Sequence, residues 1–283
     1  MNTILVTGAT GNVGRPLVTE LVNAGADVHA VTRRPESADF PAGVKAVDSA
    51  AAGLAGATAV FLNSRALAGE LDAVVAAARR GGVTRLVALS AINADDDYSR
   101  QPSRFRGDRN KEVEQRAVDS GLEWVSLRPS VFASNFAGMW AGQIRAGDAV
   151  SGPYAAASTA PIADSDIADV AAHALLTDSL VGHKVPLTGP RALTNTELVE
   201  ILGTALGRPL RYLEVAPEVV RQRFLALGFP AEFADAYIAL LSTTVDTPAL
   251  VTDNVARILG RPATTFAQWA AGHAALFTGP RHG

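Results

Sequence analysis

Apolar runs rich in valine and isoleucine alternate with helix-like spacings through the first two thirds of the chain. This alternation is typical of parallel strands joined by crossover helices, because strands buried on both faces read as nearly continuous apolar runs. The predicted strands are residues 3–7, 27–32, 44–47, 57–62, 85–89 and 123–127, and the predicted helices between them are residues 15–24, 67–80 and 107–120. The pattern therefore predicts an α/β fold with a Rossmann-type doubly wound parallel sheet.

The pattern changes after residue 128. Residues 129–163 are rich in glycine, alanine, serine and proline, and they carry an apolar aromatic patch of Phe132, Phe136 and Trp140. We interpret this stretch as a substrate-pocket segment. Its aromatic rings would offer a platform for a flat substrate, and the alternative is that they form the core of a second lobe.

The remainder of the chain reads as mainly helical. We expect helices at 164–176, 195–207, 217–227 and 230–241, and short strands at 184–187 and 212–215. Thr194 and Glu197 form the capping box that would begin the second of these helices. We therefore expect residues 1–150 to form the main domain, with 161–190 adding to it, and residues 191–283 to form a smaller, mainly helical lobe that caps the substrate.

One glycine-rich segment stands directly after the first predicted strand and before a helix. It reads Thr7-Gly8-Ala9-Thr10-Gly11-Asn12-Val13-Gly14. In this context Gly8 permits a tight turn, Gly11 lets backbone amides approach a pyrophosphate, and Gly14 lets the helix pack closely on the strand. A purely structural turn is the alternative, but spacing and position agree with a dinucleotide site. We therefore expect cofactor contacts from Gly8, Thr10, Gly11, Asn12 and Val13.

The end of the second predicted strand indicates which dinucleotide is bound. NAD sites usually hold Asp or Glu there, about 20 residues after the glycines, to bind the ribose hydroxyls. Here the sequence is Val31-Thr32-Arg33-Arg34, without a carboxylate. A guanidinium can bind a 2′-phosphate through two parallel hydrogen bonds. We therefore expect NADP (NADPH) as the cofactor, with Arg33 on its 2′-phosphate; the alternative is that both arginines are merely solvated.

Three further polar residues stand at the ends of the next two strands. Asp48 follows the third strand, where its carboxylate could accept from the adenine amino group. Asn63 and Ser64 follow the fourth strand, near the place where a dinucleotide crosses the sheet. All three are candidates for cofactor binding. Short polar side chains also cap loops, and this alternative stays open for each of them.

Composition narrows the classes of function. With no cysteine, the chain has no disulfide, no cysteine-ligated zinc and no iron–sulfur centre. Its net charge of −3 is no footprint for nucleic acid or an acidic membrane, and its five histidines lack metal-ligand spacing, so we expect no metal. We see neither a secretory signal nor an apolar stretch suited to a membrane span. We expect a cytoplasmic protein, and a homo-oligomer stays open.

Several motifs together resemble the NmrA-like, atypical branch of the short-chain dehydrogenase/reductase superfamily, including its quinone-oxidoreductase-like members. They are TGATGNVG, VTRRP, DSGLEWVSLRPSVFASNF, APIADSDIADVAAHAL, LTGPRALTNTEL and LGRPATTFAQW, and they span nearly the whole chain. The resemblance implies an NAD(P)-binding Rossmann domain with a small C-terminal lobe that closes over a substrate cleft. Some such proteins reduce quinones or other conjugated carbonyls, and others are nucleotide-sensing regulators without turnover.

The chain departs from the superfamily at its catalytic pair. Typical members carry Tyr-x-x-x-Lys, in which the tyrosine protonates the substrate oxygen and the lysine lowers the pKa of that tyrosine. In the same register this chain has Arg106 at the tyrosine position and Asn110 at the lysine position, while Lys111 is one residue off and would point elsewhere. Ser90, at the end of the fifth predicted strand, takes roughly the place of the catalytic serine.

The missing pair changes the expected substrate. Hydride transfer to an ordinary ketone gives an alkoxide about as basic as hydroxide, whose parent water has a pKa of about 15.7, so a positioned acid is needed. A quinone gives a phenolate-like product with a pKa of about 10, so water or a weak donor suffices. We therefore expect a quinone or a conjugated aromatic carbonyl as the small-molecule substrate.

Three side chains are candidates for the chemistry itself. Asn135 lies among the aromatic residues of the pocket segment and could hydrogen-bond a substrate carbonyl or cap a turn. Tyr98 follows the acidic run of residues 95–97, which we expect to be a solvated loop, and is a candidate proton donor. Together with Ser90 these are the predicted catalytic residues.

The leading hypothesis is an NADPH-dependent reductase of quinones or conjugated aromatic carbonyls. In some bacterial relatives that tailor aromatic polyketides, as in antibiotic biosynthesis, the hydroquinone reacts with O2 and gives net hydroxylation, and the residues are compatible with such a monooxygenase activity. Two alternatives stay open. One is a non-catalytic NADP sensor that changes its affinity for a protein partner, and the other is a conventional ketoreductase that uses Ser90 and Tyr98.

Overall fold

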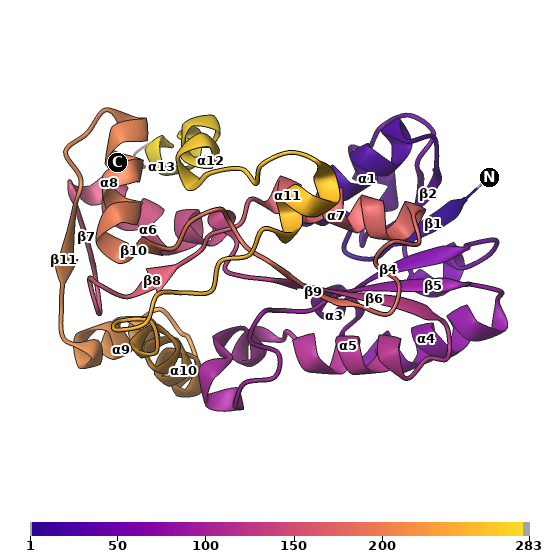
Figure 1. The fold of residues 1–283 in the computed structure, drawn as a ribbon, viewed down its shortest axis with the longest axis horizontal. Helices are drawn as coiled ribbons and strands as arrows, with labels where there is room; N and C mark the ends of the chain where they lie inside the picture. Colours follow the sequence, from indigo (N-terminus) through magenta and orange to yellow (C-terminus); the bar gives the residue numbers. More distant parts are fainter. Residues whose placement is uncertain (1, 280–283) are drawn as a thin grey trace.

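The computed structural model describes residues 2–279 and contains a seven-stranded parallel sheet with helices on both faces (Figure 1). The strand order is β3-β2-β1-β4-β5-β6-β9. These strands are β1 (Thr3–Val6), β2 (Asp27–Val31), β3 (Lys45–Val47), β4 (Ala59–Asn63), β5 (Arg85–Leu89), β6 (Glu123–Pro129) and β9 (Lys184–Leu187). The order reverses between β1 and β4, and in open parallel sheets ligands bind outside the carboxyl ends of the strands at such a reversal.

Separate layers of helices cover the two faces of this sheet. They are α1 (Gly14–Asn23) and α7 (Asp164–Leu176) on one face, and α2 (Ala50–Gly53), α3 (Ser64–Leu67), α4 (Leu71–Arg80) and α5 (Asn110–Val118) on the other. Within β1, Ile4 and Val6 belong to the core beneath α1 and α7, whereas Leu5 belongs to the core beneath α4 and α5. Because successive side chains point to opposite faces and both faces are covered, the strand reads as an unbroken apolar run.

A separate core, called the second core below to distinguish it from the cores on the two faces of the sheet, lies at the other end of the molecule (Figure 1). It is formed by α6 (Ala133–Ala146), α8 (Asn195–Leu206), α12 (Phe266–Gly272) and α13 (Ala275–Thr278). Two small sheets lie in this part: β7 (Ala149–Gly152) pairs in parallel with β11 (Arg211–Glu214), and β8 (Ser158–Thr159) pairs antiparallel with β10 (Leu193–Thr194). These elements, all at or after α6 in the chain, build a second hydrophobic unit beside the sheet, whereas α7 and β9 belong to the main sheet and its helical layer.

Three further helices, α9 (Pro217–Ala226), α10 (Ala231–Ser242) and α11 (Asn254–Leu259), lie between this lobe and the main sheet. The hairpin of α9 and α10 packs through α10 on two short 3-10 helices, η3 (Tyr98–Arg100) and η4 (Pro102–Arg106), in the loop that follows β5. On the other side, α11 packs on α7. The C-terminal segment therefore contacts both layers of the main half of the molecule.

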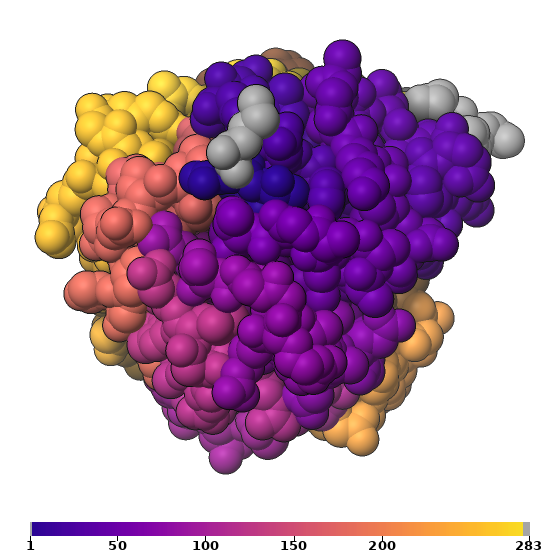
Figure 2. All heavy atoms as spheres, turned by 90° about the vertical axis from the view of Figure 1, so that its right-hand side faces the viewer, coloured from indigo at the N-terminus to yellow at the C-terminus, as the bar shows by residue number. Residues whose placement is uncertain are grey.

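Figure 2 shows the end of the molecule that lies farthest from this lobe, where indigo and purple N-terminal segments cover most of the surface. The yellow C-terminal segment is visible only along one side of that view. None of the helices described for residues 2–279 has the length and apolar character needed to cross a bilayer.

The predicted fold class is confirmed, and most predicted elements lie within a few residues of the observed ones. The capping box of Thr194 and Glu197 is present, and the helix it begins ends at Gly207 in the left-handed conformation. Two predicted helices are wrong at their beginnings. The helix predicted at 67–80 is divided, because Ala68 has a φ of 45° and the 3-10 helix η2 (Ala68–Glu70) separates α3 from α4. The helix predicted from residue 107 begins only at Asn110, since Gly107 has a φ of 99°.

Residues 129–163 hold more regular structure than the sequence pattern predicted. They contain α6, β7 and β8. The large buried side chains of α6 are Phe136, Trp140 and Ile144, at a spacing of four residues, but Gly138 and Gly142 between them weaken the helical pattern. Since α6 contributes to the second core, this core begins before residue 150. The division into two domains stays a prediction.

Candidate functional site

The glycine-rich loop between β1 and α1 has little room for side chains. Gly8 adopts a φ of 69°, in the left-handed region that favours glycine. A Cβ at Gly14 would lie 2.1 Å from the carbonyl oxygen of Gly8, and a Cβ at Gly11 would lie 3.2 Å from the same oxygen. The turn and the close approach of helix to strand therefore need glycine at positions 8 and 14, as the sequence analysis expected.

Backbone amides of this loop are available to an anion. Within residues 2–279, the amides of Thr10, Asn12 and Val13 have no hydrogen-bond acceptor, and no side chain caps the start of α1. Unsatisfied amides at a helix N-terminus, together with the positive end of its dipole, favour a phosphate group. The loop therefore fits the pyrophosphate of a dinucleotide, although its individual contacts to a cofactor stay predictions.

A buried threonine fixes the loop to the neighbouring strand. The Thr7 hydroxyl donates to the carbonyl oxygen of Phe61 at 2.8 Å and accepts from the Asn63 amide at 2.8 Å. The Asn63 side chain in turn accepts from the amides of Arg65 and Ala66 and caps α3. These bonds place the carboxyl ends of β1 and β4 side by side, where the sheet order reverses.

Three predicted cofactor contacts already have partners within the chain. The Asn63 side chain caps a helix, the Ser64 hydroxyl accepts from the amide of Arg109 at 3.0 Å, and the Asp48 carboxylate accepts from the hydroxyl of Ser49 at 3.1 Å. Of the three, Asn63 has the local capping role that the sequence analysis left open. A contact of any of these residues with the cofactor stays a prediction.

Two arginines follow β2 at the carboxyl edge of the sheet. Arg33 and Arg34 are exposed, and neither takes part in an ion pair within residues 2–279. A third cation lies nearby, because Arg15, in the first turn of α1, donates to the carbonyl oxygen of Asp39 at 2.8 Å. The end of β2 is thus basic, as a 2′-phosphate site requires.

Ser90 and the helix that follows it differ from the usual arrangement of the superfamily. Ser90 is buried, and its hydroxyl donates to the carbonyl oxygen of Asn110 at 2.9 Å. The Asn110 side chain donates to the hydroxyl of Ser103 at 3.2 Å, and the Arg106 guanidinium lies 5.1 Å from the ring centre of Phe229. The side chains at the tyrosine and lysine positions thus serve local packing, and no tyrosine replaces the missing acid there.

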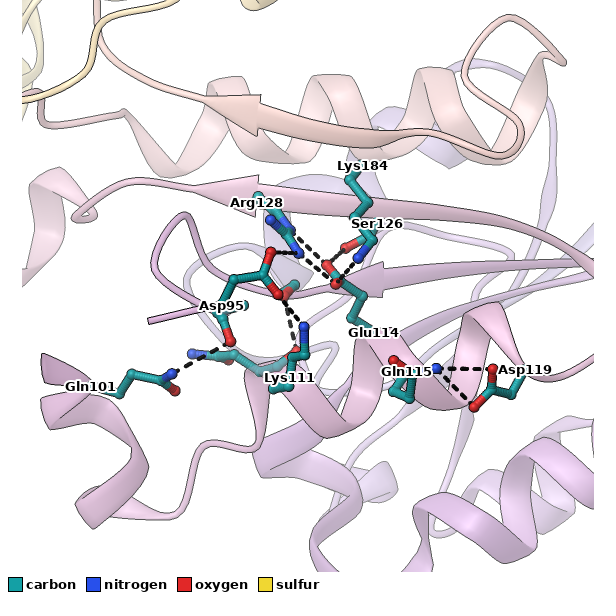
Figure 3. Close-up of polar contacts among 12 residues, drawn as sticks. Asp95, Gln101, Lys111, Glu114, Gln115, Asp119, Ser126, Arg128 and Lys184 are labelled. Carbon is teal, nitrogen blue, oxygen red and sulfur yellow. Dashed lines mark hydrogen bonds and ion pairs between the residues drawn. The ribbon is translucent and has the colours of Figure 1, made fainter. Parts of the chain in front are cut away.

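A charged cluster lies between α5 and β6, a strand on which α5 packs, and includes Lys184 of the neighbouring strand β9 (Figure 3). Glu114, with 1% of its side chain exposed, accepts from Arg128 at 2.6 and 2.7 Å and from the hydroxyl of Ser126 at 2.6 Å. Lys184 lies 2.8 Å from the same carboxylate. Asp95 joins the cluster, pairing with Arg128 at 2.7 Å and with Lys111.

Cations surround both carboxylates of this cluster. Burial alone would raise the pKa of Glu114, but hydrogen bonds from Arg128, Lys184 and Ser126 outweigh burial and lower the pKa to about 2. Hydrogen bonds from Lys111 and Arg128 likewise lower the pKa of Asp95 to about 2. Lys111 is thus engaged by Asp95. The loop of residues 95–97 is exposed, as expected, although the Asp95 carboxylate also pairs with Lys111 and Arg128.

The predicted pocket aromatics lie mostly in the second core. Phe136 and Trp140 are 2% and 4% exposed, and their ring centres are 4.7 Å apart. Phe136 also packs on Phe266 at 5.3 Å, so the core alternative describes these two side chains in the structure. Phe132, directly before α6, is half-buried against the core beneath α1 and α7. Contact of these rings with a substrate stays a prediction.

The remaining catalytic candidates are both exposed. Asn135 lies in the first turn of α6, which follows the carboxyl end of β6. Tyr98 is 50% exposed, and its ring lies 3.8 Å from the Arg104 guanidinium. Neither side chain forms a hydrogen bond to another of the residues 2–279.

Two polar residues near the glycine loop were not found by sequence reasoning. Ser134 accepts a hydrogen bond from the Asn12 side chain at 3.0 Å and donates to Asp164 at 2.8 Å. Both lie within motifs that carried the family resemblance, but nothing in the spacing of 30 residues signals their contact. Among residues 2–279, no cluster of acidic and histidine side chains is placed to hold a metal ion.

Comparison with known proteins agrees with this site. The profile of the NAD(P)H-binding family matches residues 8–178. A (4-alkanoyl-5-oxo-2,5-dihydrofuran-3-yl)methyl phosphate reductase of Streptomyces griseus is 35% identical, over 97% of this chain and 99% of the relative. An NAD(P)H azoreductase of Xenophilus azovorans is 32% identical over the same shares of both chains.

Solved structures show the same fold. An NADPH-dependent quinone oxidoreductase of Escherichia coli superposes with a TM-score of 0.79 at 21% identity, covering 95% of this chain and 98% of that chain. The family match begins at Gly8, within the glycine loop, and includes the strands from β2 to β6, and the two relatives above match nearly end to end. The chain therefore belongs to the NAD(P)H-binding family and is an NAD(P)H-dependent oxidoreductase.

Proposed function

We propose that the protein transfers a hydride from NADPH to a quinone or to another conjugated carbonyl compound. One observation carries this proposal: the dinucleotide loop is intact, while Arg106 and Asn110 stand where typical members hold their acid and its lysine. The relatives support the same class of reaction, since they are named as reductases of an oxo-dihydrofuran phosphate and of azo compounds. The fold-level neighbour is named as a quinone reductase.

The chemistry explains why this site can work without a positioned acid. A quinone that accepts a hydride and one proton becomes a hydroquinone, and NADPH becomes NADP. The intermediate anion is phenolate-like, with a parent pKa of about 10, so solvent can protonate it. A simple ketone would give an alkoxide that is several pKa units more basic and would need an acid at the position of Arg106.

The residues of this chain have three tasks in the proposed reaction. The free amides of the glycine loop bind the pyrophosphate, and Arg33 binds the 2′-phosphate and so selects NADPH over NADH. Ser90 holds the start of α5 through the Asn110 carbonyl. Asn135, at the exposed start of α6, hydrogen-bonds a substrate carbonyl, and the half-buried ring of Phe132 lies beside it in the chain.

The test is NADPH oxidation with a panel of small acceptors. Purified protein is incubated anaerobically with NADPH and, separately, with naphthoquinones, anthraquinones, an unsaturated lactone and a simple ketone. We expect one NADPH oxidised per quinone or lactone reduced and little reaction with the ketone. Binding of NADPH without oxidation by any acceptor would overturn the proposal and favour a sensor.

The O2-dependent step is a finer part of the same proposal. Repeating the assay under air lets the hydroquinone reduce O2. Hydroxylation consumes one NADPH and one O2 per quinone and releases one water, so we expect NADPH consumption to match the amount of quinone added, whereas redox cycling consumes more. Mass spectrometry of the product then separates two outcomes. A product with one additional oxygen atom supports hydroxylation of an aromatic polyketide-like substrate, whereas recovery of unchanged quinone with H2O2 shows redox cycling and contradicts hydroxylation.

A further inference from the structure

A chain of three polar side chains connects the glycine loop to the beginnings of two other helices. The Asn12 side-chain amide donates to the Ser134 hydroxyl at 3.0 Å, and that hydroxyl donates to the Asp164 carboxylate at 2.8 Å. Asn12 lies two residues before α1, Ser134 is the second residue of α6, and Asp164 is the first residue of α7. The loop that fits the pyrophosphate is thereby tied to the helix that begins the second core.

Backbone hydrogen bonds hold the Ser134 and Asp164 ends of this network together. Phe132 and Ile162 form a parallel bridge, with the Ala133 amide donating to the Ile162 carbonyl at 2.8 Å. The Ile162 amide donates to the Val131 carbonyl at 3.0 Å, so the two helix starts are held side by side. Asp164 is 8% exposed, and the positive end of the α7 dipole favours its carboxylate.

The direction of each hydrogen bond follows from this arrangement. The Ser134 hydroxyl donates its one proton to the Asp164 carboxylate, which lies at the start of α7. The serine oxygen then has lone pairs but no proton for Asn12, and it accepts from the Asn12 amide nitrogen. The asparagine side chain is therefore held in one orientation, although the residue itself lies on the exposed loop.

We propose that Ser134 and Asp164 are positioning residues that hold Asn12, and with it the free amides of the glycine loop, in the geometry that binds the pyrophosphate. This inference rests on the proposed binding of the cofactor at the loop, and it assigns two more residues, Ser134 and Asp164, a role in that binding. A loop that is already ordered loses less conformational entropy when the cofactor binds. The hydrogen bonds of Ser134 to Asn12 and Asp164 therefore raise the affinity for the cofactor without touching the reacting atoms. Because Ser134 belongs to α6, the same contact sets the glycine loop against the start of the second lobe.

The experiment is a double-mutant cycle on NADPH affinity. Dissociation constants are measured by titration, without an acceptor, for the wild type, Asn12→Ala, Ser134→Ala and the double variant. Asn12→Ala removes the hydrogen bond to Ser134, and Ser134→Ala removes that bond together with the bond to Asp164. In each variant the loop loses its one bond from this network, so we expect the dissociation constant to rise about threefold to tenfold. We expect the double variant to resemble the single variants, because both changes break the same contact.

A matched control comes from the same junction. The Ser130 hydroxyl donates to the Ala160 carbonyl and so also bridges the segments before α6 and α7, but it does not contact the glycine loop. Ser130→Ala is expected to leave NADPH affinity within about twofold of the wild type, which is below the worth of one hydrogen bond. Ser134→Thr keeps a hydroxyl and is expected to restore most of the affinity.

The outcomes separate this inference from a merely structural role. Additive effects in the cycle, an unchanged dissociation constant in Asn12→Ala, or an equal loss in Ser130→Ala would overturn it. Asn12→Ala keeps the test decisive even if Ser134→Ala does not fold, because residue 12 lies on the exposed loop. Failure of the proposed reductase activity would leave this result intact, since binding is measured without turnover.

Discussion

Two polar networks lie at the carboxyl half of the sheet, and they differ in how their charges are used. In the cluster around Glu114, every carboxylate faces at least one cation, and the central carboxylate is buried. The hydrogen-bonded side chains Asp164, Ser134 and Asn12 contain one charge and end on the glycine loop, where the amides of Thr10, Asn12 and Val13 have no partner within residues 2–279. In the first network, called the closed network below, every carboxylate is paired with a cation. The second network ends at backbone amides that are available to a ligand.

This difference indicates which network stabilises the fold and which prepares a binding site. Typical superfamily members carry their catalytic pair on the helix corresponding to α5, and here Glu114 and Lys111 of that helix are engaged in ion pairs. Buried, paired charges are costly to disturb but do not react readily. Free amides beside a single ordered side chain instead leave an anion as the missing partner.

The largest expected effect comes from opening the closed network. Glu114→Gln leaves Arg128 and Lys184 without their buried partner, and we expect the free energy of unfolding to fall by about 3 kcal/mol. NADPH affinity of the folded variant is expected to stay unchanged. Chemical denaturation at neutral pH, with NADPH titration of the same samples, measures both. An unchanged stability, or a large loss of affinity at full stability, would contradict the division between the two networks.

The contribution of Glu114 to the free energy of unfolding is also expected to depend on pH. The pKa of Glu114 in the folded protein is about 2, below its ordinary value of 4.5, so its stabilising contribution is fully present above pH 4.5. That contribution is lost as the pH falls from 4.5 towards 2. We therefore expect the stability difference between the wild type and Glu114→Gln to shrink over this range, as measured by denaturation at each pH. A difference that stays constant would show that the carboxylate is not the source.

The next largest effect is expected at the basic end of β2. Arg33→Ala removes a guanidinium that binds the 2′-phosphate, and a hydrogen-bonded charge of this kind contributes about 2 kcal/mol, or about thirtyfold in the NADPH dissociation constant. NADH affinity is expected to stay the same, because NADH lacks this phosphate. Arg34→Ala serves as the matched control. A larger loss in Arg34→Ala would assign the phosphate to the second arginine, and equal losses for NADPH and NADH would contradict a phosphate role for either.

The smallest effect is expected at Tyr98. Its ring is half-exposed beneath Arg104, and the proposed quinone chemistry needs no tyrosine acid. Tyr98→Phe is therefore expected to change kcat for a naphthoquinone by less than about threefold, well below the hundredfold or more that general acid catalysis contributes. Steady-state kinetics at saturating NADPH measure this. A loss of that larger size would instead establish Tyr98 as the proton donor and favour the ketoreductase alternative.

The sequence was most informative where one local rule decides the structure. The sheet, the glycine loop and the capping box at Thr194 follow from periodicity, backbone freedom and hydrogen bonding over a few residues. The sequence was least informative where contacts join distant segments. Asn12 and Ser134 are 122 residues apart, and Phe136 and Trp140 could line a pocket or fill a core until the position of α12 is known. The sequence did not predict that the helix over residues 67–80 is interrupted at Ala68, because alanine favours helices and rarely adopts a positive φ.

The central claim is that this protein reduces a conjugated acceptor with NADPH and without a positioned acid. The most direct measurement is an anaerobic single turnover, in which protein loaded with NADPH is mixed with a naphthoquinone and the NADPH absorbance is followed, once with ordinary NADPH and once with NADPH deuterated at the transferred position. We expect one hydroquinone per NADPH and a slower reaction with the deuterated cofactor. Tight NADPH binding with no acceptor-dependent oxidation in either experiment would contradict the claim.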